Sequence, residues 1–242
     1  MKLIHPSNIL ISGPTGSGKT QFVSRILRTK NIDPFPTRIL YLYSEWQSEY
    51  DKLLESIPEI IFQRGFPDKL MDSFSANQNN LLILDDQMSK AGDTKDLADL
   101  FTKGSHHRNL TIIYIVQNLF DKSKSMRTAS LNSQYLVLFK SPRDKTVVQH
   151  LGNQMFPKNT KFLVDSFSDA TQAPFGYLLI DLRQDTPEEM RVRANIFPGE
   201  QEFVYVPNYY KRHSAVNRKT SQEWPSPGNR KRMGATSSSK GT

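Results

Sequence analysis

Eight consecutive residues near the start of the chain have the types and spacing of a phosphate-binding loop. They match the pattern G-x-x-x-x-G-K-[ST] at every fixed position: Gly13-Pro14-Thr15-Gly16-Ser17-Gly18-Lys19-Thr20. Phosphates need several backbone N–H donors that converge on one point, and glycine lets the chain curl tightly enough to supply them. We expect Lys19 to reach the β- and γ-phosphates of ATP and the Thr20 hydroxyl to ligate Mg²⁺. A chance match is disfavoured because a predicted strand precedes the loop and a predicted helix follows it.

Two aspartates form the second feature that could do chemistry. Asp85 and Asp86 follow an apolar run at 81–84, which has the form of a Walker B segment. A Mg²⁺ ion between phosphates needs an anionic partner at a strand end near the loop, and Asp85 is the natural one. Asp86 is then placed to orient or deprotonate the attacking water, which predicts hydrolysis rather than binding alone. The simpler alternative is that both aspartates cap the next helix.

One glutamine and two arginines complete the candidate catalytic residues. Gln117 ends the apolar run 110–116, so we expect it to enter the crevice at the carboxyl ends of the strands and to sense the γ-phosphate or position water. Arg108 precedes the same run and could reach a neighbouring subunit's γ-phosphate, and Arg143 is a second candidate for that role. The plainer alternatives are a polar strand end for Gln117 and solvated or DNA-contacting charges for the arginines.

Alternating strand-like and helical patterns predict the elements that must position these residues. A buried strand over 8–12 leads into the loop, and a helix over 21–30 follows it. Further strands are predicted over 38–43, 59–62, 81–84, 110–116, 135–139, 176–181 and 190–197, and further helices over 49–56, 67–74, 96–102, 144–154 and 158–166. This alternation predicts an α/β fold with a mostly parallel central sheet and helices on both faces.

Composition limits the class of protein. The 242 residues fit one α/β domain with extensions better than two full domains. The sequence has no cysteine, which excludes disulfides and thiolate metal sites and favours an intracellular protein. No apolar run approaches the ~18 residues of a membrane-spanning helix, and residues 1–11 lack the layout of a signal peptide, so we expect no membrane association.

Positive charge is concentrated at the C-terminal end. Residues 207–242 contain eight Lys or Arg and one acid, and so carry +7 of the net charge of +8. Proline, glycine and serine are frequent there, so we predict an ATPase domain over 1–206 and a disordered basic tail over 207–242. The basic clusters at 211–212, 218–219 and 230–232 could bind DNA or direct nuclear import, and the alternative is a solubilising tail.

Several of these segments together resemble one superfamily. The loop at 13–20, Ile83-Leu84-Asp85-Asp86, His107-Arg108-Asn109 and Ile113-Tyr114-Ile115-Val116-Gln117 resemble the FtsK–HerA ATPases. Within that superfamily, the segments 100–109 and 138–145 look most like the genome-packaging ATPases of poxvirus-like and Polinton/Maverick or adintovirus-type elements. The resemblance extends from residue 4 to residue 197.

The resemblance implies a RecA-like fold and a ring of identical subunits that hydrolyses ATP at its interfaces and drives double-stranded DNA into a preformed capsid. It assigns roles to six residues: Lys19 and Thr20 for ATP and Mg²⁺, Asp85 for Mg²⁺, Asp86 as catalytic carboxylate, Gln117 as sensor and Arg108 as the arginine acting in trans. Many cellular members have glutamate where this chain has the shorter Asp86. The implied partners are DNA and a capsid or portal protein, in the host nucleus, at a viral assembly site or in the virion.

Two other functions share the same motifs. A cellular HerA-like translocase or helicase in DNA processing would have them, although single-stranded helicases usually carry further motifs that are not found here. A nucleotide-gated scaffold with little hydrolysis would have no need of Asp85, Asp86 and Gln117 together. The sequence therefore favours a DNA-packaging ATPase over both alternatives.

Overall fold

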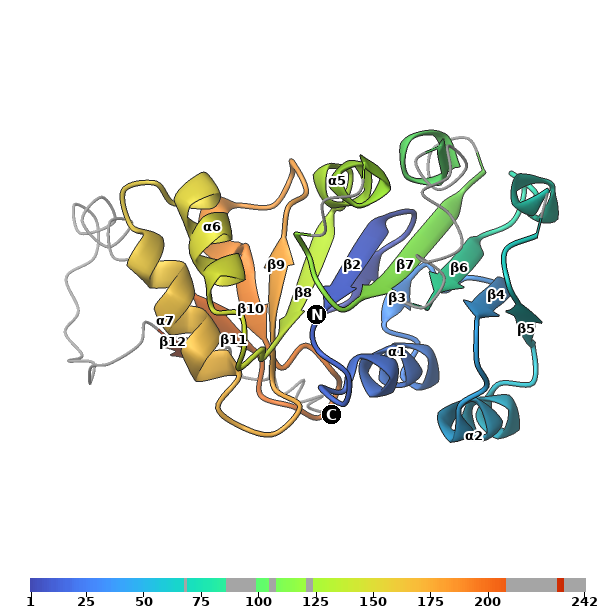
Figure 1. Cartoon of the computed structure of the whole chain (residues 1–242), viewed down its shortest axis with the longest axis horizontal. Helices are drawn as coiled ribbons and strands as arrows, with labels where there is room; N and C mark the ends of the chain where they lie inside the picture. Colours follow the sequence, from blue (N-terminus) through green and yellow to red (C-terminus); the bar gives the residue numbers. More distant parts are fainter. Residues whose placement is uncertain (68, 86–98, 105–107, 121–123, 208–229, 233–242) are drawn as a thin grey trace, which may run out of the picture.

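The computed structural model describes residues 1–67, 69–85, 99–104, 108–120, 124–207 and 230–232. These residues form an α/β fold around one ten-stranded sheet with the order β12-β11-β10-β9-β8-β2-β7-β6-β4-β5 (Figure 1). Two short strands, β1 (Leu3–Ile4) and β3 (Ile32–Asp33), pair in parallel outside that sheet. The predicted fold class is therefore confirmed.

Six parallel strands form the half of the sheet that carries the predicted site. They are β2 (Asn8–Ser12), β4 (Arg38–Tyr43), β5 (Ile60–Arg64), β6 (Asn80–Leu84), β7 (Leu110–Val116) and β8 (Tyr135–Phe139). The strand β2 lies between β7 and β8, with Leu10 opposite Tyr114 and Leu136. Because these strands are parallel, the residues that follow them meet at one edge of the sheet.

Four antiparallel strands extend the sheet beyond β8. They are β9 (Tyr177–Asp181), β10 (Val192–Ala194), β11 (Phe203–Tyr205) and β12 (Arg230–Arg232). The strand predicted over 190–197 is shorter, because a 3₁₀ turn, η4 (Glu188–Met190), precedes it and Asn195 has a φ of +56°. The strand β12 lies within the segment that was expected to be a disordered tail. In the structure its three residues pair with β11 and add a strand to the sheet.

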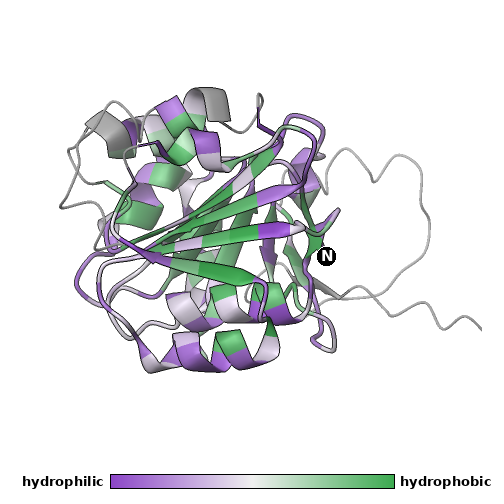
Figure 2. Ribbon diagram, turned by 90° about the vertical axis from the view of Figure 1, so that its right-hand side faces the viewer, coloured by the Kyte–Doolittle hydropathy of each residue, from purple (hydrophilic) through white to green (hydrophobic). Residues whose placement is uncertain are grey.

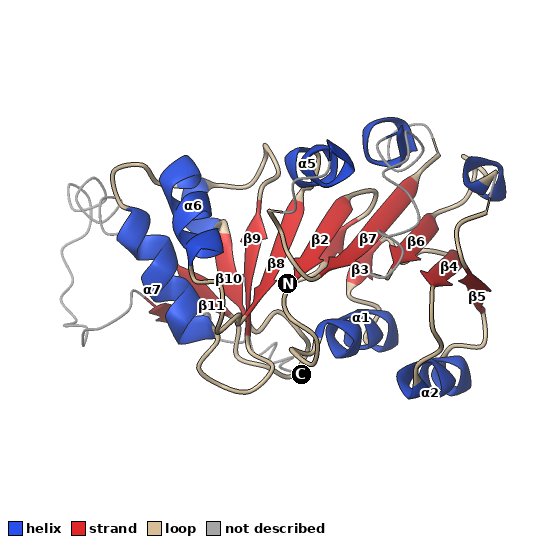
Figure 3. Ribbon diagram, in the orientation of Figure 1, coloured by secondary structure: helices blue, strands red, loops and turns tan. Residues whose placement is uncertain are grey.

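Helices cover both faces of the sheet (Figure 3). One face carries α1 (Lys19–Arg28) and α2 (Ser48–Ser56), and the other carries α5 (Lys124–Leu131), α6 (Thr146–Met155) and α7 (Thr160–Ala170). A hydrophobic cluster lies on each face of the sheet, and alternate residues of a strand point into the two clusters. Ile9 and Ile11 pack in the cluster that includes α1, and Leu10 packs in the other. The central strands are therefore mostly apolar (Figure 2).

Two predicted helices differ from the structure. The segment predicted as a helix over 67–74 forms only a 3₁₀ turn, η1 (Leu70–Ser73). Of the helix predicted over 96–102, residues 96–98 lie outside the described part of the chain, and η3 (Leu100–Gly104) is a π-helical turn. The helix α5 was not predicted. No helix in the described ranges combines the length and apolar character that crossing a membrane requires.

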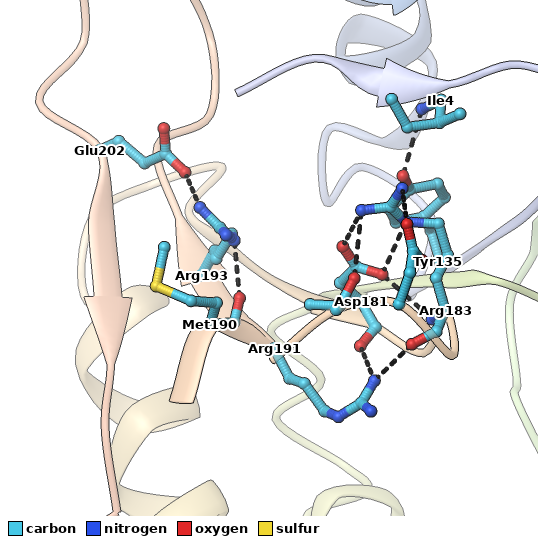
Figure 4. Close-up of polar contacts among 10 residues, drawn as sticks. Ile4, Tyr135, Asp181, Arg183, Met190, Arg191, Arg193 and Glu202 are labelled. Carbon is cyan, nitrogen blue, oxygen red and sulfur yellow. Dashed lines mark hydrogen bonds and ion pairs between the residues drawn. The ribbon is translucent and has the colours of Figure 1, made fainter. Parts of the chain in front are cut away.

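A buried ion pair fixes the chain where β9 ends (Figure 4). The carboxylate of Asp181, which is fully buried, accepts hydrogen bonds from Nε and Nη2 of Arg183 at 3.1 and 3.0 Å. Arg191 donates from Nη1 to the backbone oxygens of Asp181 and Arg183 at 3.1 and 2.8 Å. Because Asp181 pairs with Tyr135 at the start of β8, this network lies at the opposite edge of the sheet from the predicted site.

Candidate nucleotide site

The predicted phosphate-binding loop connects β2 to α1. Its first residue is tied to the neighbouring strand, since the amide of Gly13 donates to the backbone oxygen of Val116 at 3.2 Å. A Cβ atom at Gly13 would lie 2.6 Å from Cβ of Phe139, so only glycine fits there. Gly16 and Gly18 have φ values of +78° and +102°, which L-residues rarely adopt. The backbone therefore curls as a phosphate cradle requires, and α1 begins directly after it.

Lys19 lies inside this loop. Its side chain is buried, and its Nζ atom donates to the backbone oxygens of Gly13 at 2.5 Å and Pro14 at 3.0 Å. The ammonium group is thus held at the mouth of the cradle, close to the amides that would surround a phosphate. A positive charge at that point, together with the amino end of α1, favours an anion.

Asp85 follows β6 and is also buried. Its Oδ2 atom accepts hydrogen bonds from the hydroxyl of Tyr50 at 2.5 Å and from Nε2 of Gln47 at 3.2 Å. Burial, together with the neighbouring Tyr41 and Asp85, raises the pKa of Tyr50 well above its usual range. Tyr50 therefore stays protonated and remains a hydrogen-bond donor to the carboxylate.

A single pocket of about 400 Å³ brings the predicted residues together. Its lining includes Lys19, Thr20, Asp85 and Gln117. These side chains come from α1 and from the ends of β6 and β7, three elements that are distant in sequence. Mg²⁺ is commonly bound by one or two carboxylates together with waters and phosphate oxygens. The hydroxyl of Thr20 and the carboxylate of Asp85 suit a metal ion of this kind that is bound with a nucleotide.

A second pocket of about 570 Å³ adjoins the first. Thr15 and Gln117 line both pockets, and Arg143 lines only the second. Arg143 was the second candidate for an arginine that reaches a neighbouring subunit's γ-phosphate. It lies beside the phosphate-binding loop of its own chain. Its neighbour Asp144 accepts hydrogen bonds from the amide and hydroxyl of Thr146, and these contacts lower the pKa of its carboxyl group.

Arg108 lies away from both pockets. It precedes β7, whereas Gln117 follows that strand, and seven strand residues span about 20 Å. Its Nη1 atom donates to the backbone oxygen of Phe74 at 3.3 Å. Arg108 is therefore too far from the loop of its own chain to contact a nucleotide there. The predicted catalytic residue Asp86 lies outside the described residues.

Several pocket residues were not predicted from the sequence. Gln47 lines the pocket from the loop after β4, and Phe175 lines it from the segment before β9. Tyr50, on α2, contacts the pocket residue Asp85. The signal for Gln47 was its position after a strand, because strands in such sheets deliver ligands at their carboxyl ends. Phe175 carried no sequence signal, since an aromatic residue beside a strand usually belongs to the core.

Comparison with known proteins shows that this fold is similar to the fold of a viral protein. No family model and no curated protein matches the sequence. Among solved structures, the chain is similar to the genome packaging NTPase B204 from Sulfolobus turreted icosahedral virus 2. For its complex with AMPPCP the TM-score is 0.54 at 15% identity, over 78% of this chain and 96% of that chain. For its complex with sulfate the values are 0.51 and 14%, over 78% and 95%.

A similar likeness holds for B204, the DNA-packaging ATPase from Sulfolobus Turreted Icosahedral Virus, with a TM-score of 0.51 at 13% identity over 78% of this chain and 96% of that chain. The chain therefore has the fold of the P-loop NTPases together with the phosphate-binding loop that its sequence predicted. At the level of the fold, the expected resemblance to viral genome-packaging ATPases is confirmed.

Proposed function

We propose that this chain hydrolyses ATP and uses the energy to translocate double-stranded DNA, packaging a viral or virus-like genome into a capsid. One observation carries the proposal: Lys19, Thr20, Asp85 and Gln117 line one pocket of a P-loop NTPase fold. That fold is similar over 78% of the chain to a protein named as a genome packaging NTPase. The sequence resemblance to packaging ATPases of the FtsK–HerA superfamily supports the DNA-translocating part of the proposal.

The residues of the pocket suit phosphoryl transfer to water. The loop amides and Lys19 bind the β- and γ-phosphates, while Thr20 and Asp85 hold Mg²⁺. Bound Mg²⁺ would neutralise charge on the phosphate oxygens. Gln117, at the end of β7, positions water or senses the γ-phosphate, and Asp86 accepts the proton of that water. In this scheme Asp85 serves the metal and Asp86 serves the water.

The position of Arg108 supports assembly of identical subunits. An arginine that stabilises charge on the γ-phosphate must approach it closely, and Arg108 lies at the far edge of its own sheet. We therefore propose a homo-oligomeric ring in which Arg108 serves the pocket of a neighbour. The further partners are double-stranded DNA and a capsid or portal protein, in the host nucleus, at a viral assembly site or in the virion.

The test is ATP turnover by the purified protein without DNA, with long double-stranded DNA and with single-stranded DNA. We expect stimulation by the duplex, no turnover in Lys19→Ala, and ATP binding without turnover in Asp86→Asn. Leu131→Ala, which alters an exposed side chain on α5, should behave as the unmodified protein.

Each alternative function has its own outcome in this assay. Stimulation by single strands alone would favour a helicase. Nucleotide binding without any turnover would favour a scaffold. Unchanged turnover in Asp86→Asn would remove that residue from the catalytic machinery.

A further inference from the structure

Phe175 is a large apolar side chain that lies exposed at the rim of the nucleotide pocket. It is 58% exposed, and it lines the pocket together with Gly18 and Lys19. Its φ of +61° is in the left-handed region, which is rare for a bulky residue. Disfavoured backbone conformations persist where the surrounding structure enforces them, and they concentrate at ligand sites. The conformation of Phe175 therefore needs an explanation.

The turn that carries Phe175 presses its ring against the phosphate-binding loop. The amide of Gly176 donates to the backbone oxygen of Ala173 at 3.0 Å, and a Cβ atom at Gly176 would lie 2.5 Å from the backbone oxygen of Ala170. On the other side, a Cβ atom at Gly18 would lie 2.9 Å from Cδ1 of Phe175. The tight turn and the bare glycine together bring the aromatic ring directly against the start of α1.

The hydrophobic core does not account for this ring. The neighbouring aromatic cluster, among the described residues, consists of Phe22, Phe139, Tyr177 and Phe197, with ring centroids 4.7 to 6.1 Å apart. Phe175 is not one of its members. Tyr177, only two residues later, is buried in that cluster, whereas Phe175 turns outward to the pocket.

The strand order indicates which part of a nucleotide would meet Phe175. Asp85 and Gln117 follow β6 and β7, on one side of β2, and Phe175 precedes β9, on the other side beyond β8. Metal and attacking water act at the γ-phosphate, so that end of the triphosphate points toward β6 and β7. The base then points toward β9, where the exposed ring lies.

We propose that Phe175 is the stacking platform for the base of the bound nucleotide. The proposal rests on the nucleotide site described above. An aromatic face stacks on any base, because every base has a π-face. Phe175 therefore strengthens the binding of nucleotides relative to bare polyphosphates and does not by itself distinguish adenine from guanine.

The test compares ligands with and without a base. We would measure equilibrium affinities of the full chain for AMPPCP, its guanine counterpart and inorganic tripolyphosphate, each with Mg²⁺. Phe175→Ala should weaken both nucleotides roughly tenfold and leave tripolyphosphate unchanged. Phe175→Trp, which keeps an aromatic face, should retain nucleotide affinity. Leu131→Ala is the control for loss of an exposed apolar side chain.

A fourth variant separates binding from folding. Glycine suits a φ of +61°, so Phe175→Gly should melt at the same temperature as the unmodified protein or higher, while losing nucleotide affinity as Phe175→Ala does.

Two results would overturn the stacking role alone. The first is an equal loss of tripolyphosphate and nucleotide affinity in Phe175→Ala, which would mean that the ring only supports the loop. The second is an unchanged nucleotide affinity in Phe175→Ala. If the unmodified protein binds neither AMPPCP nor tripolyphosphate, the nucleotide site itself is wrong and both proposals fail.

Discussion

Asp85 is held by side chains from outside its own strand. The hydroxyl of Tyr50 and the amide of Gln47 both donate to Oδ2. Two donors on one oxygen fix the orientation of the carboxylate, as hydrogen bonds to a metal-ligating side chain commonly do. Tyr50 is thus a positioning residue for the predicted metal ligand.

Removing only the hydroxyl of Tyr50 should disturb the metal site. The ring of Tyr50 packs on Tyr41 and Phe62, with centroids 4.9 and 5.1 Å away, and Tyr50→Phe keeps those contacts. A hydrogen bond to a charged group contributes about 1.5–3 kcal/mol, so we expect the Mg²⁺ concentration for half-maximal turnover to rise roughly tenfold or more. Magnesium titrations of ATP turnover and of AMPPCP binding would measure this effect.

Tyr43→Phe is the matched control for that variant. Tyr43 belongs to the same aromatic cluster, with its ring 5.8 Å from that of Tyr50. The hydroxyl deletion is equal in size, but the hydrogen bonds to Asp85 stay. A similar rise in the magnesium requirement in both variants would contradict a specific positioning role for Tyr50.

At the scale of elements, His5 links the N-terminal segment to a central strand. His5 is buried between β1 and β2, and its Nδ1 atom lies 2.7 Å from the hydroxyl oxygen of Thr111 on β7. Burial lowers the pKa of His5 below its ordinary value of 6.5, against a smaller opposing effect of a hydrogen bond with Asn109. The folded protein therefore favours the neutral imidazole.

This pKa shift predicts how stability depends on pH. Below about pH 6.5 the unfolded chain takes up a proton on His5 more readily than the folded chain does. The folded state therefore becomes less stable relative to the unfolded state as the pH falls. We expect the free energy of unfolding to decline from pH 7 to pH 5, and to decline less steeply in His5→Gln. Denaturation curves across that range would measure the slopes.

His150→Gln is the control, because His150 is an exposed histidine on α6. The comparison uses slopes rather than absolute stabilities, since His5→Gln also changes a buried contact. Equal slopes in the unmodified protein and in His5→Gln would mean that His5 does not control this part of the pH dependence.

At the scale of the whole molecule, the candidate site is divided between the two edges of the sheet. The loop, Asp85 and Gln117 meet at the carboxyl ends of the parallel strands, and Arg108 lies at the amino end of β7. A ring that faces one edge of a subunit toward the other edge of its neighbour would complete the site. Arginines acting in trans accelerate phosphoryl transfer by about 10³–10⁵-fold in other P-loop enzymes.

Mixing two inactive variants should therefore restore activity. Arg108→Ala keeps its own loop but supplies no arginine, and Lys19→Ala supplies the arginine but lacks a working loop. We expect turnover of Arg108→Ala alone to fall by about 10³-fold, Lys19→Ala alone to show none, and the mixture to recover a measurable part of the activity. Arg127→Ala, an exposed arginine of α5, is the control and should remain active. An inactive mixture of co-assembled subunits would argue against a trans role.

Local sequence determined the phosphate-binding loop and most strands. The loop closes through short-range contacts, such as the 3.2 Å hydrogen bond from the amide of Ser17 to the oxygen of Pro14, and its glycines supply the positive φ values. Strands buried on both faces are continuous apolar runs, so 8–12, 38–43, 110–116 and 135–139 could be predicted without knowing their neighbours. The positions of Asp85 and Gln117 could then be predicted as well, because polar residues that follow parallel strands lie together at one edge of the sheet.

Only the tertiary structure decided which side chains surround those residues. Tyr50 reaches Asp85 because β4 pairs with β6, and Phe175 meets Gly18 because the turn before β9 folds back over the loop. The parallel pairing of β7 with β2 places Arg108 at the opposite edge of the sheet from its own loop. The physical reason is that a local pattern specifies burial and periodicity but not which strands become neighbours. That choice depends on how all the apolar faces pack together.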